Sequence, residues 1–577
     1  MCETPQFLVQ SFLDRSATRL PDKVAVVCDN ARLTYREVRE RSELLGVFLR
    51  DIGLKKGDRV AIWLENSGES VISLFGILKA DGVFTMLNAS MKARKLAYIL
   101  NDCGVRGLIT HSDKAGLVHE ALSQSLTVEH VIWVGSMPKA GLRGIHFHLW
   151  SDLVPAASSQ QSAFRAPQGP EQSRRAISDQ KSATRSGSSA MSYELRAMSS
   201  RVIDLDLATI IYTSGSTGDP KGVMLTHLNM VSAATSITTY LENREDDIVI
   251  NFLPLAFDYG LYQVLMAFKF GGTVVLEKSF TYPHKAIQKM VQEKVTGFPG
   301  VPTIFAILLG LKDLNRYDFS KLRYITNTAD ALPASHIEKL RKAFPHVRIY
   351  SMYGLTECKR VSYLSPAEID RRPLSVGRGM PNEEVWIVDE SGNPVGPGVI
   401  GELVVRGSNV MLGYWGLPAE TDRVLKPGNY SGERVLYTGD LFRMDEEGFL
   451  YFVGRKDDMI KSRGERISPK EIERCLCAID DVAEAAVIGT PDDILGQSIV
   501  AFVRCHEGKS VSEKEVLRHC QKNLEDFMIP HFISFVNALP RNSSGKIDKL
   551  ALKDLAAERK NGNPVTQFSL PQKKEHI

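Results

Sequence analysis

The chain of 577 residues is long enough to form two or more domains with sizeable hydrophobic cores. Its 43% hydrophobic and 24% charged residues are typical of a globular protein, and a net charge of +3 is too small for a broad polyanion-binding surface, so nucleic acid is not expected as a partner. The first residues carry no basic segment followed by an apolar core, and no stretch of about 18 uncharged apolar residues occurs. We therefore expect a cytoplasmic protein without a transmembrane segment.

Short strand-like runs alternate with helical patterns through the first part of the chain. Apolar runs occupy 24–27, 59–64, 107–110 and 131–134, and residues 35–49 have a helical pattern. Such alternation predicts an α/β fold with largely parallel sheets, arranged in a large layered N-terminal domain.

Residues 156–200 interrupt this pattern. They are rich in Ser, Ala, Gln and Arg and poor in large apolar side chains, so they cannot bury enough surface to offset the entropy cost of ordering them. We predict a disordered surface insertion here. The last residues, 561–577, are similarly polar and are predicted to form a flexible tail.

The stretch 209–223, TIIYTSGSTGDPKGV, opens from an apolar strand pattern into a small, hydroxyl-rich loop. Backbone N–H groups and short hydroxyls suit the binding of a polyphosphate, and they are supplied by Thr213, Ser214, Gly215, Ser216, Thr217 and Gly218. Lys221 adds a positive charge. The loop is not a Walker A motif, because Pro220 precedes the lysine and Gly222 follows it. Taken alone, such a run is more often a flexible turn.

The string TSGSTGDPKGV closely resembles the phosphate loop of the adenylate-forming superfamily, which contains acyl- and aryl-CoA synthetases, amino-acid adenylation domains and luciferases. Further strings typical of that superfamily follow in the expected order: YGLTE at 353–357, YTGDL at 437–441, GRKDD at 454–458, KSRGERI at 461–467 and NSSGKI at 542–547. The resemblance covers nearly all of the chain except the insertion and the tail. It implies an ATP-dependent acid–thiol ligase similar to acyl-CoA synthetases and acyl-acid AMP ligases. Amino-acid adenylation domains are the group with the next strongest resemblance.

The same resemblance implies two domains. An N-terminal AMP-binding domain is expected over 1–456, and a smaller, mobile α+β lid domain over 457–560. In similar enzymes the hinge is the residue two positions after the arginine of the GRKDD string, which here is Asp457. Outside that motif, an aspartate in a charged turn would be an ordinary solvated residue.

The resemblance assigns the first half-reaction to a site that neutralises charge. A carboxylate attacks the α-phosphorus of ATP and pyrophosphate leaves, so fixed donors and Mg²⁺ are needed. The loop from Thr213 to Lys221 would bind the β- and γ-phosphates, and Thr356 the α-phosphate. Glu357 would hold Mg²⁺, a hard cation that takes oxygen ligands.

Four further residues are assigned to the nucleoside by the same resemblance. Asp440 would accept hydrogen bonds from the ribose hydroxyls, with Arg455 assisting. Tyr353 belongs to the same nucleotide-binding motifs. Asn327 lies in a string, TNTAD, that departs from the glycine- and alanine-rich loop usual near adenine, although its amide could still bind the base.

Three residues of the predicted lid are assigned to the two half-reactions. Lys546 would lie between the carboxylate and the α-phosphate during adenylation; outside the SGKIDK context it would be an ordinary surface lysine. Lys461 would contribute to the thioester-forming state. Gly464 would line the tunnel for the phosphopantetheine of CoA or of a carrier protein, although a glycine there could equally serve a turn.

The acid substrate is the least determined part of the prediction. Phe257 stands where many acyl-CoA synthetases carry a histidine gate, which puts that gating mechanism in doubt. Asp258 would bind a substrate ammonium if the chain activated an amino acid, but fatty-acid-activating relatives carry an aspartate here too. Gly300 belongs to an apolar wall, 297–302, that suits an acyl or aryl group.

The alternatives therefore stay open at this point. The leading prediction is an enzyme for a fatty or other acyl acid that uses CoA or an acyl carrier protein as acceptor. The nearest rival is a stand-alone amino-acid adenylating enzyme that loads a peptidyl carrier protein. An oxygenase of the luciferase type has no sequence mark in its favour, and an inactive binding protein would be expected to have lost Lys546, Glu357 or Lys221.

Overall fold

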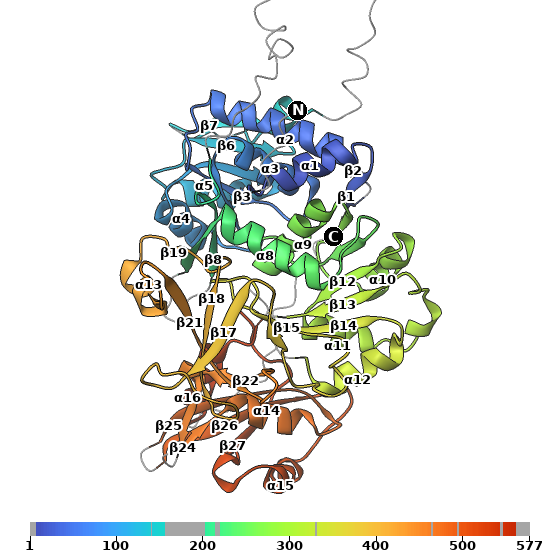
Figure 1. Ribbon diagram of the computed structural model, residues 1–577, viewed down its shortest axis with the longest axis vertical. Helices are drawn as coiled ribbons and strands as arrows, with labels where there is room; N and C mark the ends of the chain where they lie inside the picture. The colour runs from blue at the N-terminus through green and yellow to red at the C-terminus, as the bar shows by residue number, and fades with distance from the viewer. Residues whose placement is uncertain are drawn as a thin grey trace, which may run out of the picture. The chain divides into compact units, whose positions relative to one another are not determined.

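The computed structural model describes residues 7–29, 31–139, 141–142, 144–155, 202–213, 220–328, 332–462, 465–492, 495–542 and 546–560 (Figure 1). The chain divides into two compact units. The first comprises Met1–Ala234, Asn243–Lys278 and Tyr414–Gly416, and the second Thr235–Glu242, Ser279–Gly413 and Leu417–Ile577. The predicted insertion at 156–200 and the predicted tail at 561–577 lie outside the described residues.

The first unit contains a sheet that is parallel except at one end. Its strands follow the order β19 (Gly413–Tyr414), β9 (Lys221–Thr226), β8 (Leu207–Thr213), β4 (Val83–Met86), β3 (Arg59–Trp63), β5 (Val105–His111), β6 (His130–Val134) and β7 (His146–Leu149). Strands β8 and β9 pair antiparallel, so they form a hairpin around the predicted phosphate loop. The same unit holds the parallel strands β10 (Ile248–Asn251), β11 (Thr273–Leu276) and β1 (Val24–Cys28), with β2 (Ala31–Thr34) antiparallel to β1.

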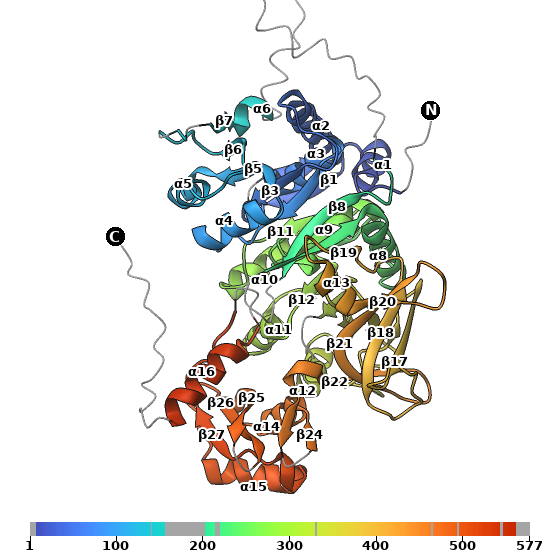
Figure 2. The ribbon, with the colours of Figure 1, turned by 90° about the vertical axis from the view of Figure 1, so that its left-hand side faces the viewer.

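Helices cover both faces of the β3–β7 part of this sheet. The helices of the first unit are α1 (Ser11–Arg19), α2 (Tyr35–Asp51), α3 (Gly68–Lys79), α4 (Ala93–Asp102), α5 (Ala115–Leu122), α6 (Trp150–Leu153) and α9 (Asp258–Phe270); α8 (His227–Tyr240) begins in this unit and ends in the second. Ala61 and Trp63 pack in one hydrophobic cluster with Leu96 of α4 and Leu122 of α5. Figure 2 shows α4 and α5 on one face and α2 and α3 on the other.

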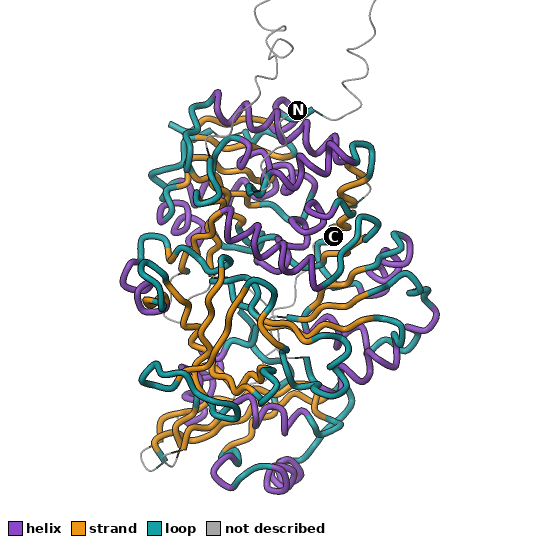
Figure 3. The backbone as a smooth tube through the Cα atoms, viewed as in Figure 1, coloured by secondary structure: helices purple, strands orange, loops and turns teal. Residues whose placement is uncertain are grey.

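The second unit begins with a parallel group of strands. Strands β12 (Gly297–Gly300), β13 (Tyr324–Asn327) and β14 (Arg348–Tyr353) are parallel, and β15 (Ser362–Leu364) and β16 (Arg378–Gly379) extend them antiparallel. The helices of this part are α10 (Pro283–Gln292), α11 (Pro302–Leu309) and α12 (Ala334–Ala343). Figure 3 shows how helices and strands alternate here, as the sequence pattern predicts for an α/β fold.

A separate antiparallel sheet follows in the second unit. Its strands are β17 (Glu383–Val388), β18 (Gly401–Gly407), β21 (Arg434–Met444) and β20 (Leu425–Pro427) in that order, with β22 (Leu450–Arg455) paired to β21 and helix α13 (Pro418–Val424) before β20. Val388, Val404 and Val435 form its buried cluster. This sheet presents both Asp440 and Arg455.

The C-terminal segment of the second unit is α+β. It contains β23 (Ile460–Ser462), β24 (Glu465–Ile467), α14 (Pro469–Cys477), β25 (Val482–Asp492), β26 (Gly496–Cys505), α15 (Glu513–Asn523), β27 (Phe532–Phe535) and α16 (Lys549–Lys560). Val487 and Val503 pack in one cluster with Leu476 of α14, whereas Phe502 packs in another with Leu552 of α16. Helices therefore cover both faces of β25–β27 (Figure 2). No helix among the described residues is long and apolar enough to cross a membrane.

Candidate active site

The carboxyl ends of three adjacent parallel strands bring predicted site residues together. Gly300 of β12 pairs with Asn327 of β13, and Asn327 pairs with Ser351 of β14. Tyr353 ends β14 two residues later, and Asn327 is fully buried. Ligands of α/β proteins bind at this edge of a parallel sheet, so the position fits the predicted nucleotide and acid site.

An irregularity in β21 sets the position of Asp440. The register of β21 against β18 shifts between Tyr437 and Leu441, and Gly439 has a φ of +70°, which a residue without a Cβ adopts freely. The Thr438 hydroxyl donates to the carbonyl of Leu403 at 2.8 Å and accepts from the Asp440 amide at 3.2 Å. The glycine and threonine of the YTGDL string thus fix the aspartate that follows them.

Tyr353, Asp440 and Arg455 form one polar cluster. The Tyr353 hydroxyl donates to Asp440 Oδ2 at 2.6 Å, and Arg455 Nε donates to Asp440 Oδ1 at 3.1 Å. Burial raises the pKa of Asp440, while the charge of Arg455, the hydrogen bond from Tyr353 and the charge of Lys546 act in the opposite direction. A carboxylate offers about four acceptor positions, so Asp440 retains capacity for two ribose hydroxyls.

Lys546 and Glu357 lie within electrostatic reach of this cluster. The charge of Lys546 lowers the pKa of Asp440. Burial lowers the pKa of Arg455, but the negative charges of Asp440 and Glu357 outweigh this effect, so the pKa of Arg455 is raised. Lys546 is exposed, and its amide donates to Asn542 Oδ1 at 3.0 Å. The structure therefore places Lys546 and Glu357 near the same Asp440–Arg455 pair, and their roles in adenylation and metal binding stay predictions.

The surroundings of Glu357 suit Mg²⁺ bound together with a polyphosphate. No group of three or more His, Cys, Asp or Glu side chains within the described ranges could hold a metal ion by itself. Mg²⁺ is usually bound by one or two carboxylates with substrate phosphates and water completing its octahedral shell. The carboxylate of Glu357 fits that arrangement, so Glu357 would hold the ion and the ion would neutralise phosphate charge.

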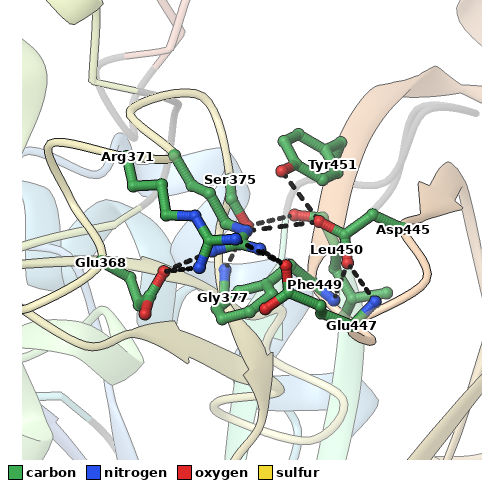
Figure 4. A network of polar contacts seen from close by, with 10 residues as sticks. Glu368, Arg371, Ser375, Gly377, Asp445, Glu447, Phe449, Leu450 and Tyr451 are labelled. Atoms are coloured by element: carbon green, nitrogen blue, oxygen red, sulfur yellow. Dashed lines mark hydrogen bonds and ion pairs between the residues drawn. The ribbon is translucent and has the colours of Figure 1, made fainter.

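An ion-pair network anchors the β21–β22 hairpin that carries Asp440 and Arg455. Arg372, only 7% exposed, pairs with Glu368, with Asp445 at 3.4 Å and with Glu447, and its guanidinium lies 4.0 Å from the ring centroid of Phe449. Figure 4 shows the same region with Ser375, whose hydroxyl donates to the Leu450 carbonyl at 2.9 Å. The network fixes the turn of the hairpin to the 365–377 loop.

The strands that flank the predicted phosphate loop are anchored within the first unit. Thr213 ends β8 and pairs with Lys221, the first residue of β9. The Lys221 ammonium lies 5.4 Å from the ring centroid of Tyr414, and the Trp415 amide donates to the Gly222 carbonyl at 2.8 Å. Ser214, Gly215, Ser216, Thr217 and Gly218 lie outside the described residues.

The sequence reasoning missed Tyr414 and Trp415. An aromatic pair in a glycine-containing stretch has no local signature of function, and only the tertiary pairing of β19 with β9 places it beside Lys221. A signal was nevertheless available, because large aromatic side chains such as those between Gly413 and Gly416 usually have a packing partner.

The predicted acid-pocket residues fall in both units. Phe257 is the N-cap of α9 and Asp258 its first residue, so the carboxylate lies at a helix N-terminus, where negative charge is favourable. Gly300 ends β12, and a Cβ at this position would lie 2.5 Å from the Phe305 ring. The ring of Phe305 thus packs directly on the glycine backbone.

Asp457, the predicted hinge, lies in a short 3-10 helix, Lys456–Asp458. The neighbours on both sides are paired: Lys456 with Glu402 at 2.9 Å and Asp458 with Lys549 of α16 at 3.1 Å. Lys461 lies in β23, and Gly464 lies outside the described residues.

The structure thus combines an α/β fold with a buried acidic residue, Asp440, that is bonded to Tyr353 and Arg455 and is acted on by the charge of Lys546. Residues 13–415 match the AMP-binding enzyme family, and residues 471–546 match the AMP-binding enzyme C-terminal domain. The chain is 32% identical over 562 residues to a long-chain-fatty-acid–CoA ligase of Escherichia coli O157:H7, covering 96% of this chain and 95% of that protein.

Two solved structures have the same fold. The anthranilate CoA ligase AuaEII in complex with anthranoyl-AMP superposes with a TM-score of 0.81 and 26% identity, covering 97% of this chain and 99% of that one. ATP-bound MatB from Rhodopseudomonas palustris superposes with a TM-score of 0.78 and 26% sequence identity. The match covers 96% of this chain and 99% of that one. The chain belongs to the AMP-binding enzyme family and is an AMP-forming acid–thiol ligase, as the sequence motifs predict.

Proposed function

We propose that the chain activates a fatty or other acyl acid as its acyl-adenylate and transfers the acyl group to the thiol of CoA. The observation that carries this proposal is the cluster of Tyr353, Asp440 and Arg455 with Lys546 and Glu357 in electrostatic reach. In such a cluster Asp440 would accept hydrogen bonds from the ribose, Glu357 would bind the metal ion and Lys546 would supply a positive charge. The 32% identity to a long-chain-fatty-acid–CoA ligase supports the substrate class.

The proposed first half-reaction is an in-line displacement at phosphorus. A carboxylate oxygen of the acid bonds to the α-phosphorus of ATP, the bond to the bridging oxygen of the β-phosphate breaks, and pyrophosphate leaves. Lys546 would stabilise charge on the carboxylate and α-phosphate oxygens, with Thr356 donating to the latter and the loop of Thr213 and Lys221 binding the leaving phosphates.

The proposed second half-reaction forms the thioester. The thiolate sulfur attacks the acyl carbon, AMP leaves with its phosphate oxygen, and the thiol proton passes to solvent. We propose that the segment after Asp457 moves between the two half-reactions, so that Lys461 and Gly464 replace Lys546 beside the adenylate. The domain boundary at 456 and 457 belongs to the same proposal.

A substrate panel tests the proposal. The purified enzyme with ATP and Mg²⁺ is given octanoate, palmitate, benzoate or each of several amino acids, and pyrophosphate release is measured. CoA or a phosphopantetheinylated carrier protein is then added, and the thioester is detected by mass. We expect release with fatty acids and acyl-CoA as product. Release with amino acids alone would favour the amino-acid adenylating alternative, whereas transfer of a fatty acyl group to the carrier protein alone would show that CoA is not the acceptor.

A further inference from the structure

The loop that carries Thr356 and Glu357 contains a backbone conformation that few residues adopt. The amide of Val361 donates to the Tyr353 carbonyl at 3.0 Å, which closes the loop at its base. Within it, Lys359 has a φ of +65° and is only 3% exposed. The left-handed region is uncommon for residues other than glycine and persists only where the surroundings hold it.

A buried side-chain amide bridges this turn, in addition to the backbone hydrogen bond that the Arg360 amide donates to the Cys358 carbonyl at 2.8 Å. Asn409 is 1% exposed, and its Nδ2 donates to the Cys358 carbonyl at 2.7 Å and to the Arg360 carbonyl at 3.2 Å. These carbonyls belong to the residues directly before and after Lys359. The NH₂ group of Asn409 therefore links the two residues that flank Lys359, the residue with the positive φ.

The Asn409 segment also contacts the glutamate itself. The amide of Met411, two residues after Asn409, donates to the Glu357 carbonyl at 2.7 Å. Glu383 Oε2 lies 3.4 Å from Asn409 Nδ2, and a Cβ at Gly407 would lie 2.5 Å from Asn409 Oδ1, so the glycine leaves room for the amide oxygen. The NH₂ group of Asn409 thus faces the loop carbonyls.

We propose that Asn409 is a positioning residue for the metal-binding loop: it holds Lys359 in the left-handed conformation and thereby fixes the direction of the Glu357 carboxylate. The inference rests on the proposed function, which assigns Mg²⁺ to Glu357. It predicts that loss of the Asn409 amide weakens the use of Mg²⁺ more than the binding of the acid. Outer-shell partners of metal ligands typically contribute about 10- to 100-fold in metal affinity or activity.

The test measures the half-saturating Mg²⁺ concentration in acid-dependent ATP–pyrophosphate exchange. Asn409→Ala should raise this concentration about tenfold, with the KM of the acid changed less than threefold. Asn66→Ala is the matched control. Asn66 is also buried, and its Nδ2 likewise bridges two carbonyls, those of Leu253 and Glu277. Its loss should lower the melting temperature to a similar extent and leave the Mg²⁺ midpoint unchanged.

A rescue variant separates positioning from general destabilisation. Glycine adopts a φ of +65° without strain, so in a Lys359→Gly background the loss of Asn409 should shift the Mg²⁺ midpoint less than threefold. An equal shift in both backgrounds overturns the inference. If Asn409→Ala does not fold, the shift of the Mg²⁺ midpoint caused by Asn409→Ser is compared in the wild-type and Lys359→Gly backgrounds. A smaller shift in the Lys359→Gly background supports the inference, and an equal shift overturns it.

The Glu357→Gln variant distinguishes failure of this inference from failure of the proposed function. If Glu357→Gln raises the Mg²⁺ midpoint and Asn409→Ala does not, the assignment of Glu357 stands and the role of Asn409 is wrong. If neither the Mg²⁺ midpoint nor the rate changes in Glu357→Gln, the proposed role of Glu357 fails and the inference fails with it.

Discussion

The hydroxyl of Tyr353 donates a 2.6 Å hydrogen bond to the carboxylate of Asp440, a residue 87 positions further along the chain. The bond joins the end of a parallel strand, β14, to the middle of an antiparallel one, β21. Arg455 donates to the other oxygen of the same carboxylate from β22. Three of the motifs that the sequence marks thus meet at one buried acid.

The first prediction concerns the pH dependence of ATP binding. Asp440 accepts a hydrogen bond from a ribose hydroxyl best when it is ionised. Burial raises the pKa of Asp440 above that of an exposed aspartate. The KM for ATP should therefore rise as the pH falls through the pKa of Asp440. Tyr353→Phe removes a hydrogen bond that lowers this pKa. The rise in KM should therefore begin at higher pH in the variant than in the wild type.

Steady-state kinetics from mildly acidic to neutral pH would measure this shift. Tyr363→Phe is a suitable control, because Tyr363 stacks on Tyr240 with ring centroids 4.0 Å apart and has no contact with Asp440 among those described. A Tyr353→Phe profile that superposes on the wild-type profile would show that the hydrogen bond does not tune Asp440.

The second prediction concerns Lys546. Lys546→Ala should reduce acid-dependent pyrophosphate exchange by roughly 100-fold or more, because a donor at a developing oxyanion contributes about 3 kcal/mol. Conversion of a preformed acyl-adenylate to the thioester should continue. Lys553, exposed on α16, provides the control variant Lys553→Ala. Exchange at the wild-type rate in Lys546→Ala would refute the assignment.

The third prediction concerns the hinge. Asp457→Pro restricts φ within the short 3-10 helix, so it should hinder a change of backbone conformation at this residue. Adenylation should remain within about threefold of wild type while thioester formation falls by about tenfold or more. The two half-reactions are measured separately, by pyrophosphate exchange and by single-turnover transfer from preformed acyl-adenylate. Equal losses in both would argue against a hinge at this residue.

The fourth prediction concerns Asp258. Its carboxylate occupies the first turn of α9, and such charges contribute about 0.3–1 kcal/mol to helix stability. Asp258→Ala should therefore lower the melting temperature slightly and reduce activity toward a fatty acid only modestly. A residue that bound a substrate ammonium would behave differently, with a loss of about 3–5 kcal/mol in amino-acid activation. Wild-type exchange with an amino acid, lost selectively in the variant, would contradict our account.

Local pattern predicted the layered part of the fold well. The predicted strands 24–27 and 131–134 correspond to β1 and β6, and the predicted helix 35–49 corresponds to α2. Thr34 and Glu37 form a capping box at its start, which is why the helix begins there. The helix continues to Asp51, because the end of a helix depends on packing as much as on pattern.

The contacts that build the site were beyond the reach of local pattern. The motifs identified Tyr353 and Asp440, but their hydrogen bond depends on a register shift between β18 and β21. The positive φ of Lys359 and the amide of Asn409 that bridges it arise from a tertiary contact between two loops. Neither residue type marks such a role in a single sequence.

The most direct test of the central claim is the fate of ATP in a complete reaction with palmitate, Mg²⁺ and CoA. Phosphorus NMR and mass spectrometry would follow the nucleotide and the thioester together. Our account predicts AMP, pyrophosphate and palmitoyl-CoA in equal amounts, with pyrophosphate exchange in the absence of CoA that falls by roughly 100-fold or more in Lys546→Ala. Formation of ADP and phosphate, or an acyl thioester without AMP, would contradict it.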